Sequence, residues 1–262
     1  MRRIGIGYRT PLAHWIHACP DEIQCLEITA EHFFDEPHAL KKLRGLYPLM
    51  LHGLGLSLGT PGPMDPVYLQ KFAQVCQQAD PLWISEHIAF TRTREVDLGH
   101  LNPVSYTDAT LQTFIEHVQQ LRQVCQKPVL LENITSHIRP FGDYSETEFI
   151  NLLCERSGAR LLLDVTNLYV NSKNHGYDAM SWLAEIQADY IQQLHVVGYH
   201  LRDGQYFDTH GEAIQPEIFT LIERVIEYSA VQTVILERDQ NFPDIAQLRG
   251  ELTRLESCFE LH

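Results

Sequence analysis

The chain alternates regularly between short apolar runs and longer amphipathic segments, and this alternation most strongly constrains its fold. The apolar runs are Ile4–Arg9, Cys25–Glu31, Leu49–Leu54, Leu82–Phe90, Pro128–Ile134, Arg160–Asn167, Tyr190–Tyr199 and Thr233–Asp239. Continuous apolar stretches such as Leu161–Leu163 are typical of strands that are buried on both faces. Eight alternating units without a break in composition predict a single α/β domain over residues 1–262, a (β/α)8 TIM barrel. A doubly wound open sheet is the alternative.

The segments between these runs carry helix signals. Asp65 and Pro66 form an N-cap followed by a proline at the first helical position, and apolar residues recur at helical spacing after them. Further helices are predicted within Ser105–Cys125, Glu146–Cys154, Asp178–Ile186, Pro216–Ile226 and Ile245–Leu255. Three connections are unusually long and each follows a strand, which marks them as candidates for function. They are Thr91–Val104, Tyr169–Tyr177 and His200–Gln215.

Charge and composition exclude some classes of function. The formal net charge of −14 argues against a broad nucleic-acid surface, because phosphate binding needs clustered Lys and Arg. No apolar run reaches the roughly 18 residues of a membrane-spanning helix, and the N-terminal run is too short for a signal peptide. The 6 cysteines are scattered without a CxxC pair, which fits reduced, buried thiols. We therefore expect a cytoplasmic protein that binds neither nucleic acid nor a membrane.

Polar and charged residues recur where the predicted strands end. They are His52, His87, Glu132, Asp164 with Asn167, His195 with Asp208 and His210, and Glu237. The carboxyl ends of barrel strands meet on one face, where barrels collect their active-site residues. Each residue alone has an ordinary explanation, such as a hydrogen-bonded loop position for His52 or an ion pair with Arg238 for Glu237. Together they would bury uncompensated charge, which is costly unless cations are bound.

The size of this set predicts more than one metal ion. Four His and four carboxylates exceed the three protein ligands of a typical catalytic zinc, so two or three ions are needed to use them. Three divalent ions against four carboxylates leave a net charge of +2, which favours an anionic guest such as a thiolate. His and carboxylate ligands without Cys suit iron, manganese or zinc. None of the lysines lies at a predicted strand end, which argues against a Schiff-base aldolase and weakens a sugar-isomerase interpretation.

With these residues assembled, the sequence resembles the multinuclear non-haem iron-dependent oxidative enzymes, of which the methanobactin oxazolone-forming enzyme is one. The resemblance covers nearly the whole chain, and together its motifs are specific. The motifs are Leu26–Ile28 with Glu31, Leu51–Ser57, Ser85–His87, Leu131–Asn133, Leu163–Asn171, Asp208–His210 and Leu236–Glu237, with Leu101–Pro103 and Tyr106–Thr107 before the long helix. The resemblance implies a barrel of the xylose isomerase-like type.

The order of the candidate ligands is also similar to that of endonuclease IV-type repair enzymes, which share the barrel and bind three zinc ions. Here Asn167 stands where those enzymes have a His, and the acidic charge does not suit a DNA-binding face; both departures favour the oxidative family. The resemblance implies one ion on His52 and His87, bridged by Glu132 to a second ion on Asp164, His195 and Glu237, and a third position formed by Asn167, Asp208 and His210.

The resemblance further implies an oxygen-dependent oxidoreductase that uses iron and O2 to modify cysteine residues of a ribosomally made precursor peptide. We expect Glu132, Asp164, His195, Asp208 and His210 to take part in the reaction as well as in metal binding. Such enzymes commonly need a separate protein that presents the peptide, and here the barrel leaves no spare recognition domain. The alternatives are a zinc-dependent phosphodiesterase of the endonuclease IV type, a sugar isomerase-like barrel and a non-catalytic metal-binding barrel.

The third metal position is expected to be the weakest. Asp208 and His210 fall in the long predicted loop His200–Gln215, so their placement depends on that loop. Asn167 offers a neutral amide oxygen, which is a poorer ligand than imidazole for iron or zinc. The first two positions draw mainly on strand ends, which are more rigid.

Overall fold

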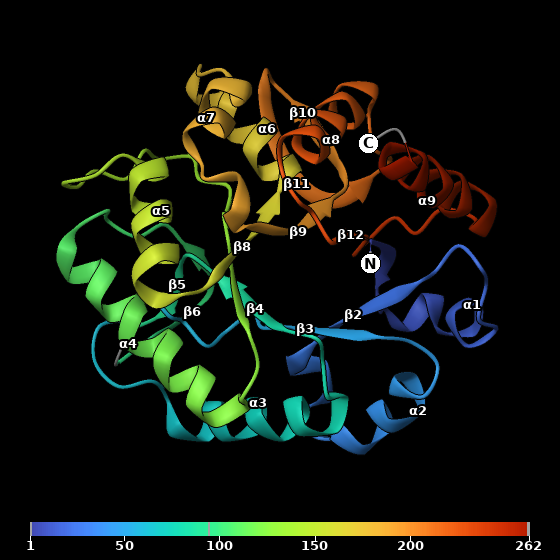
Figure 1. Cartoon of the computed structure of the whole chain (residues 1–262), viewed down its shortest axis with the longest axis horizontal. Helices are drawn as coiled ribbons and strands as arrows, with labels where there is room; N and C mark the ends of the chain where they lie inside the picture. Colours follow the sequence, from blue (N-terminus) through green and yellow to red (C-terminus); the bar gives the residue numbers. More distant parts are fainter. Residues whose placement is uncertain (1, 94, 261–262) are drawn as a thin grey trace.

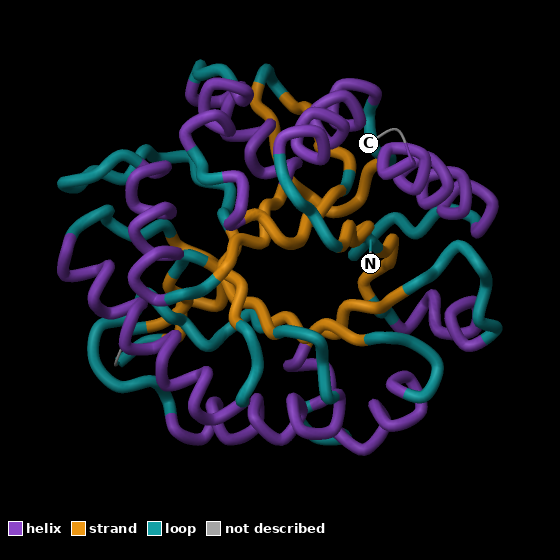
Figure 2. Tube along the Cα trace, in the orientation of Figure 1, coloured by secondary structure: helices purple, strands orange, loops and turns teal. Residues whose placement is uncertain are grey.

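The computed structural model describes residues 2–93 and 95–260. The two ends of the predicted domain 1–262 and position 94 of the connection Thr91–Val104 therefore lie outside the described residues. The described part of the chain forms a closed barrel of parallel strands that helices surround (Figure 1). Coloured by secondary structure, the strands form a ring and the helices lie outside it (Figure 2). The predicted barrel is confirmed, and the open doubly wound sheet is excluded.

Every barrel strand falls on one of the eight predicted apolar runs. The barrel strands are β1 (Arg3–Gly7), β2 (Cys25–Thr29), β3 (Leu49–His52), β4 (Ile84–His87), β7 (Val129–Glu132), β8 (Arg160–Asp164), β9 (Ile191–Val196) and β12 (Thr233–Leu236). Neighbours pair in parallel, and β12 closes the ring by pairing with β1. Each predicted run extends beyond its strand at the carboxyl end, because its last residues belong to the connection that follows the strand.

In the described part of the chain, six helices follow the predicted signals, and α1 (Ala13–His17), α2 (Leu40–Arg44) and α6 (Val165–His175) are additions. The six are α3 (Pro66–Ala79), α4 (Asp108–Cys125), α5 (Glu146–Ser157), α7 (Ala179–Glu185), α8 (Pro216–Tyr228) and α9 (Ile245–Glu260). Asp65 caps α3 by accepting from two backbone N–H groups, and Ser145 forms a capping box with Glu148 at α5. Helices α1 and α2 are too short for a periodic pattern to reveal them. Within the described residues, no helix combines the length and apolarity needed to cross a membrane.

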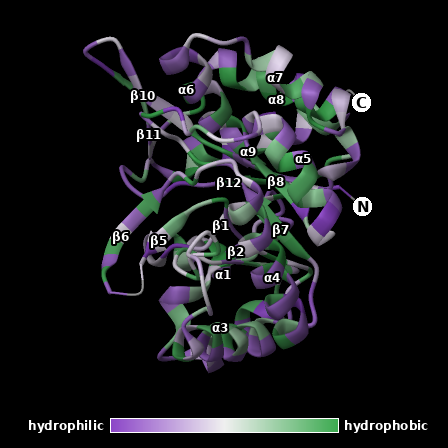
Figure 3. Cartoon of the chain, turned by 90° about the vertical axis from the view of Figure 1, so that its left-hand side faces the viewer, coloured by the Kyte–Doolittle hydropathy of each residue, from purple (hydrophilic) through white to green (hydrophobic). Residues whose placement is uncertain are grey.

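The three long connections contain secondary structure of their own. Two hold hairpins, β5 (Phe90–Arg92) with β6 (Asp97–Asn102) and β10 (Gly198–Arg202) with β11 (Gln205–Glu212). Both hairpins project on the same side of the molecule (Figure 3). The predicted loop Tyr169–Tyr177 is wrong, because most of it belongs to α6, which begins directly after β8. Asp164 caps this helix by accepting from the backbone N–H of Asn167, so Asn167 lies in a helical turn and not at a strand end.

Side chains inside the barrel form an apolar layer beneath a polar one. The apolar layer is a cluster separate from the main core and consists of Cys25, Met50, Trp83, Leu130, Leu162 and Ile235. Successive strand residues point to opposite faces, so the residues two positions further along share the interior. These are the buried polar residues Glu27, His52, Ser85, Glu132, Asp164 and Glu237. The main core, between barrel and helices, takes residues of the other parity such as Leu161 and Leu163.

A buried ion pair fastens the last helix to the polar end of the barrel. Arg238 is 2% exposed and its guanidinium lies 3.1 Å from a carboxylate oxygen of Glu251 in α9. The same guanidinium donates to the backbone oxygen of Gly211 in β11 at 3.0 Å. Arg238 therefore joins the end of β12, the hairpin and α9, and the alternative of an ion pair between Glu237 and Arg238 is wrong.

We predict that Arg238→Ala lowers the free energy of unfolding by about 3–5 kcal/mol, because it leaves the carboxylate of Glu251 buried without its partner. Urea denaturation followed by circular dichroism measures the change. Arg224→Ala is the control, since it breaks an exposed pair with Glu227 and is expected to cost less than about 1 kcal/mol. Equal losses in the two variants would contradict the anchoring role of Arg238.

Candidate metal centre

The carboxyl-terminal face of the barrel brings all nine predicted residues into one region. They are His52 of β3, His87 of β4, Glu132 of β7, Asp164 of β8, Asn167 of α6, His195 of β9, Asp208 and His210 of β11, and Glu237 directly after β12. Their His and carboxylate ligand atoms form overlapping groups in which all such atoms lie within 4.8 Å of one another. Asp208 and His210 lie on a hairpin strand and not in the predicted loop.

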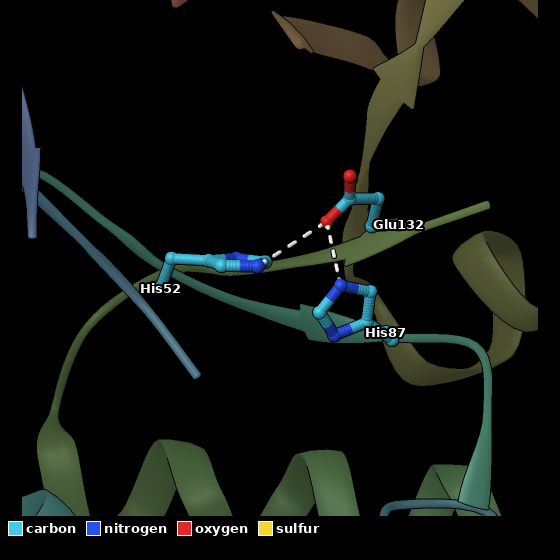
Figure 4. A group of neighbouring side chains, drawn as sticks. All are labelled: His52, His87 and Glu132. Atoms are coloured by element: carbon cyan, nitrogen blue, oxygen red, sulfur yellow. Dashed lines mark ion pairs between the residues drawn. The ribbon is translucent and has the colours of Figure 1, made fainter. Parts of the chain in front are cut away.

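The first group consists of His52, His87 and Glu132. One carboxylate oxygen of Glu132 lies 3.4 Å from Nε2 of His52 and 3.3 Å from Nε2 of His87 (Figure 4). The Nδ1 atoms of the two rings have partners of their own, Ser85 Oγ for His52 and Glu86 Oε1 for His87, each at 2.9 Å. These partners fix the orientation of both rings, so that the Nε2 atoms face the shared carboxylate.

Glu86 has a structural role, and the alternation of β4 places it on the opposite face from Ser85 and His87. It is 2% exposed, and its carboxylate accepts the backbone N–H groups of Leu56 and His87 at 2.8 Å each. It therefore supports the ring of His87 and fastens the loop after β3, and it is not a member of the ligand groups.

The second group consists of Glu132, Asp164, His195 and Glu237. Nδ1 of His195 lies 2.9 Å from Oε1 of Glu132 and 3.0 Å from Oε2 of Glu237. Glu132 thus turns one oxygen toward the first group and the other toward the second. This is the arrangement that a carboxylate bridging two ions requires.

Glu27 supports the second group and was not among the predicted site residues. Its Oε1 lies 2.7 Å from Nε2 of His195, and its Oε2 accepts from the Gln193 amide at 2.5 Å. Gln193 in turn accepts from the indole N–H of Trp83 at 2.5 Å. This chain of contacts orients the imidazole of His195 from below. The alternation of β2, which places Glu27 on the same face as Cys25, is the sequence signal that would have found it.

The third group consists of Asp164, Asp208 and His210, with Asn167 beside them. Nε2 of His210 lies 2.7 Å from Asp208. The side-chain amide of Asn167 donates to the backbone oxygen of Asn133 at 3.1 Å, and its Oδ1 is buried without a hydrogen-bond partner. That oxygen is therefore free to bind a cation. Asp164 belongs to this group and to the second, as Glu132 belongs to the first and second.

Arg9 and Asp239 border the third group and were also missed. Asp239 lies 2.8 Å from Nδ1 of His210, and Arg9 contacts Asp239 at 2.5 Å and Glu237 at 3.2 Å. His210, Glu237 and Asp239 form a fourth overlapping group. His210 has a positive φ of 51°, a region that residues with a Cβ seldom adopt and that occurs often at functional sites. Arg9 and Asp239 are the last residues of two predicted runs, but nothing in the sequence pairs them.

The electrostatics of the centre reflect buried imidazoles among carboxylates. Burial, with the neighbouring His87 and His195, holds the pKa of His52 well below its usual value and keeps it neutral. Burial would lower the pKa of His87 also, but Glu132 and Glu86 raise it to about 9. Burial lowers the pKa of His195 too, yet Glu27, Glu132 and Glu237 outweigh it and raise this pKa well above the usual value. Without metal, protons on His87 and His195 offset the carboxylates, and bound ions would replace those protons.

The chemistry of the donor set fits divalent cations. Glu132 Oε2, Asn167 Oδ1 and Asp208 Oδ1 are buried oxygens without a hydrogen-bond partner in the described structure. Six carboxylates meet here, two more than the sequence set contained: Glu27, Glu132, Asp164, Asp208, Glu237 and Asp239. Three divalent ions and Arg9 would leave a net charge of +1, less than the +2 expected from four carboxylates. The centre would still favour an anionic guest.

A pocket opens onto the ligand groups. Polar residues of the centre line its floor, and the apolar side chains Leu54, Leu101 and Ile134 also line it. The side chains of His52 and His195 are 2% and 0% exposed, whereas those of Asp208 and His210 are 10% and 21% exposed. The third group is thus the part of the centre that a molecule entering the pocket meets.

We predict that Glu132→Ala loses more metal than any other single ligand change, because it leaves two ions under-coordinated. Elemental analysis of the purified variant measures metal per chain. Glu31→Ala is the size-matched control, since Glu31 is a partly buried carboxylate that accepts the N–H groups of Leu54 and Gly55 outside the ligand groups. Unchanged metal content in Glu132→Ala would contradict the bridging assignment.

We predict that mild chelation removes roughly one ion in three, and that this ion comes from the third group. Asn167→His is expected to tighten that position, because imidazole is the better ligand. Metal titration into stripped protein, with elemental analysis at each step, measures both effects. Three positions of indistinguishable affinity, or no gain in Asn167→His, would contradict this account of Asn167.

Solved structures similar to this chain share its fold. D-psicose 3-epimerase from Clostridium cellulolyticum has a TM-score of 0.65 at 11% identity and covers 99% of this chain and 98% of its own. Endonuclease IV from Thermus thermophilus has a TM-score of 0.62 at 14% identity and covers 99% of this chain and 100% of its own. A xylose isomerase-like TIM barrel protein from Mycobacterium smegmatis has a TM-score of 0.60 at 11% identity, covering 99% and 98%. The predicted xylose isomerase-like barrel is confirmed; at such identities the likeness concerns the fold alone.

Closer relatives match in sequence over nearly the whole chain. A UPF0276 protein of Chromobacterium violaceum is 33% identical over 257 residues, covering 97% of this chain and 93% of its own length. A UPF0276 protein of Rhizorhabdus wittichii is 32% identical over 254 residues, covering 95% and 91%. The family model "RiPP precursor modification enzyme MbnB/TglH/ChrH" matches residues 3–260. The chain therefore belongs to this family of enzymes, which modify ribosomally made precursor peptides.

Proposed function

We propose that this chain is an oxidoreductase that holds two or three iron ions at the mouth of the barrel and uses O2 to oxidise cysteine residues of a precursor peptide. The observation that carries the proposal is the joining of three ligand groups by the shared carboxylates of Glu132 and Asp164. The family's action on precursor peptides supplies the class of substrate. Bound iron would supply one-electron redox chemistry with O2 as the oxidant.

The residues of the centre divide between holding ions and meeting the substrate. His52, His87 and His195 are buried and would bind as neutral imidazoles. Glu132 and Asp164 would each serve two neighbouring ions. Asp208 and His210 are the partly exposed members, so the ion that they hold would be the one a substrate reaches first. The net positive charge of a filled centre would draw a cysteine thiolate into the pocket.

A separate protein that presents the peptide is part of the proposal. Exposed apolar side chains on three loops around the carboxyl-terminal face support it, because such side chains often mark interaction surfaces. They are Val96 and Leu98 on the β5–β6 hairpin, Ile138 and Phe141 between β7 and α5, and Leu201 on the β10–β11 hairpin. Phe141 is 84% exposed.

A zinc-dependent phosphodiesterase is the second candidate, because grouped His and carboxylate ligands also suit zinc. The lack of clustered Lys and Arg side chains in the pocket speaks against a nucleic-acid substrate. Among the described residues that line the pocket, Arg9 is the only Lys or Arg. Its guanidinium is paired with Glu237 and Asp239. A phosphodiester substrate would find no free cation there apart from the metal.

The deciding experiment is purification under anaerobic conditions, followed by metal analysis, visible spectroscopy and measurement of oxygen uptake. We expect two or three iron ions per chain, a new charge-transfer band when N-acetylcysteine amide is added, and oxygen uptake that depends on the iron. His195→Ala is expected to lose iron and keep the circular dichroism of the unmodified protein. His117→Ala is the matched control, because His117 is a buried histidine whose ring nitrogens contact the backbone oxygens of Leu58 and Gly62 outside the centre.

Other outcomes separate the candidates. Colourless, zinc-loaded protein that cleaves a phosphodiester such as bis(4-nitrophenyl) phosphate would replace the oxidative proposal with the hydrolytic one. Iron that remains bound without any oxygen uptake, with thiol and reductant present, would point to a non-catalytic metal-binding barrel. Loss of secondary structure in His195→Ala would show that His195 is needed for the fold as a core residue, and would contradict its assignment as a ligand.

A further inference from the structure

A second pocket lies beside the metal centre and is built differently. Its walls are aromatic, formed by Tyr106, Tyr144, Tyr177 and Trp182, and Glu146 lies among them. The pocket lies between the loop after β7, the amino-terminal end of α5 and the segment that joins α6 to α7. None of the predicted ligands lines it.

This aromatic pocket adjoins the centre through the residues next to the ligands. Ile88 follows His87 and Asn133 follows Glu132 in the chain, and both line the pocket. Ile134 lines this pocket and the metal pocket alike. A peptide whose cysteine reaches the centre would therefore carry a neighbouring side chain past the aromatic walls.

Glu146 carries a charge that the described structure leaves without a cation. Its carboxylate accepts from the indole N–H of Trp182 at 2.8 Å and from the hydroxyl of Tyr106 at 3.4 Å. Both donors are neutral, and Glu146 forms no ion pair with another described residue. Burial raises the pKa of Glu146, and the hydrogen bonds from Trp182 and Tyr106 act in the opposite direction. The donors fix the carboxylate in place beside the pocket.

The other charged groups around the pocket add to the negative charge of the Glu146 carboxylate. Asp178 and Glu185 also line it, against Arg139 and the ring of His175. Arg139 donates to the backbone oxygen of His175, and the His175 ring contacts the backbone oxygen of Ser136 at 2.7 Å. Three carboxylates against one guanidinium give the pocket a net negative charge, within a chain whose formal net charge is −14.

We propose that this aromatic pocket binds an arginine side chain of the precursor peptide, at a position near the modified cysteine. The inference rests on the proposed function, in that a peptide is the substrate. A guanidinium stacks on aromatic faces and donates several N–H groups in one plane, so it matches Tyr and Trp walls beside a fixed carboxylate better than an ammonium does. Glu146 and Trp182 would then set which peptides are accepted, while the ligand groups carry out the chemistry.

The walls are held in place before any peptide arrives. The backbone oxygen of Tyr106 accepts from the N–H groups of Asp143 and Tyr144, and the N–H of Tyr106 donates to Phe141. These bonds fasten the loop after β7 against the segment before α4. A pocket with fixed walls binds a side chain with less loss of conformational freedom.

The test compares N-acetylarginine amide with its citrulline counterpart, which has nearly the same shape and no charge. Binding is followed by the fluorescence of Trp182; Trp15 and Trp83 are buried elsewhere. We expect saturable binding of the arginine compound, at least about tenfold weaker binding of the citrulline compound, and a similar loss in Glu146→Gln. Glu155→Gln is the matched control on an exposed position of the same helix and is expected to bind like the unmodified protein.

Equal binding of the arginine and citrulline compounds would overturn the proposal, as would unchanged binding in Glu146→Gln. Equal binding of N-acetyllysine amide would overturn the assignment to arginine. The comparison of compounds on the unmodified protein remains decisive if Glu146→Gln does not fold. Because neither compound contains a thiol, measurements on metal-stripped and metal-loaded protein separate this pocket from the centre. If protein purified under anaerobic conditions contained no iron and still bound the arginine compound, the proposed function would fail and the pocket assignment would stand.

Discussion

Buried charge at the carboxyl-terminal face of the barrel is the constraint on which the rest of this structure depends. Carboxylates and imidazoles are collected there with little contact to water, and such an arrangement is stable only if each charge has a partner. The partners visible in the chain are Ser85, Glu86, Gln193 and Arg9, each of which contacts a member of the centre. Bound cations would be partners for the buried oxygens of Glu132, Asn167 and Asp208 that accept no hydrogen bond.

The architecture around the centre serves this constraint. The apolar interior layer beneath it, with Trp83 among its members, keeps water from entering the polar layer from below. Helix α6 and strand β11 are joined by Asn174, which accepts from the backbone N–H of Tyr206 and donates to its oxygen. The helix that carries Asn167 and the strand that carries Asp208 and His210 are thereby held as one unit. On the other side, Arg238 holds the segment of Glu237 against α9.

The sequence predicted the barrel and the gathering of polar residues on its carboxyl-terminal face because both depend on local, periodic signals. Apolar runs located the strands, and polar residues at their carboxyl ends located the centre. Glu27 was not predicted as a site residue because it lies within an apolar run and not at its carboxyl end. Arg9 and Asp239 could not be paired, since 230 positions separate them in the sequence and only closure of the barrel between β1 and β12 brings them together. Helix α6 was mistaken for a loop because it follows β8 without any turn residues, and its cap, Asp164, was already assigned as a ligand.

Glu132 joins the first ligand group to the second, and Asp164 joins the second group to the third. The first and third groups have no residue in common, and both share a residue with the second group. If ions occupied only the first and third groups, they would share no ligand and would form two separate mononuclear sites. Filling the second group, which includes the buried residues His195 and Glu237, would therefore join two separate ion sites into one multinuclear centre.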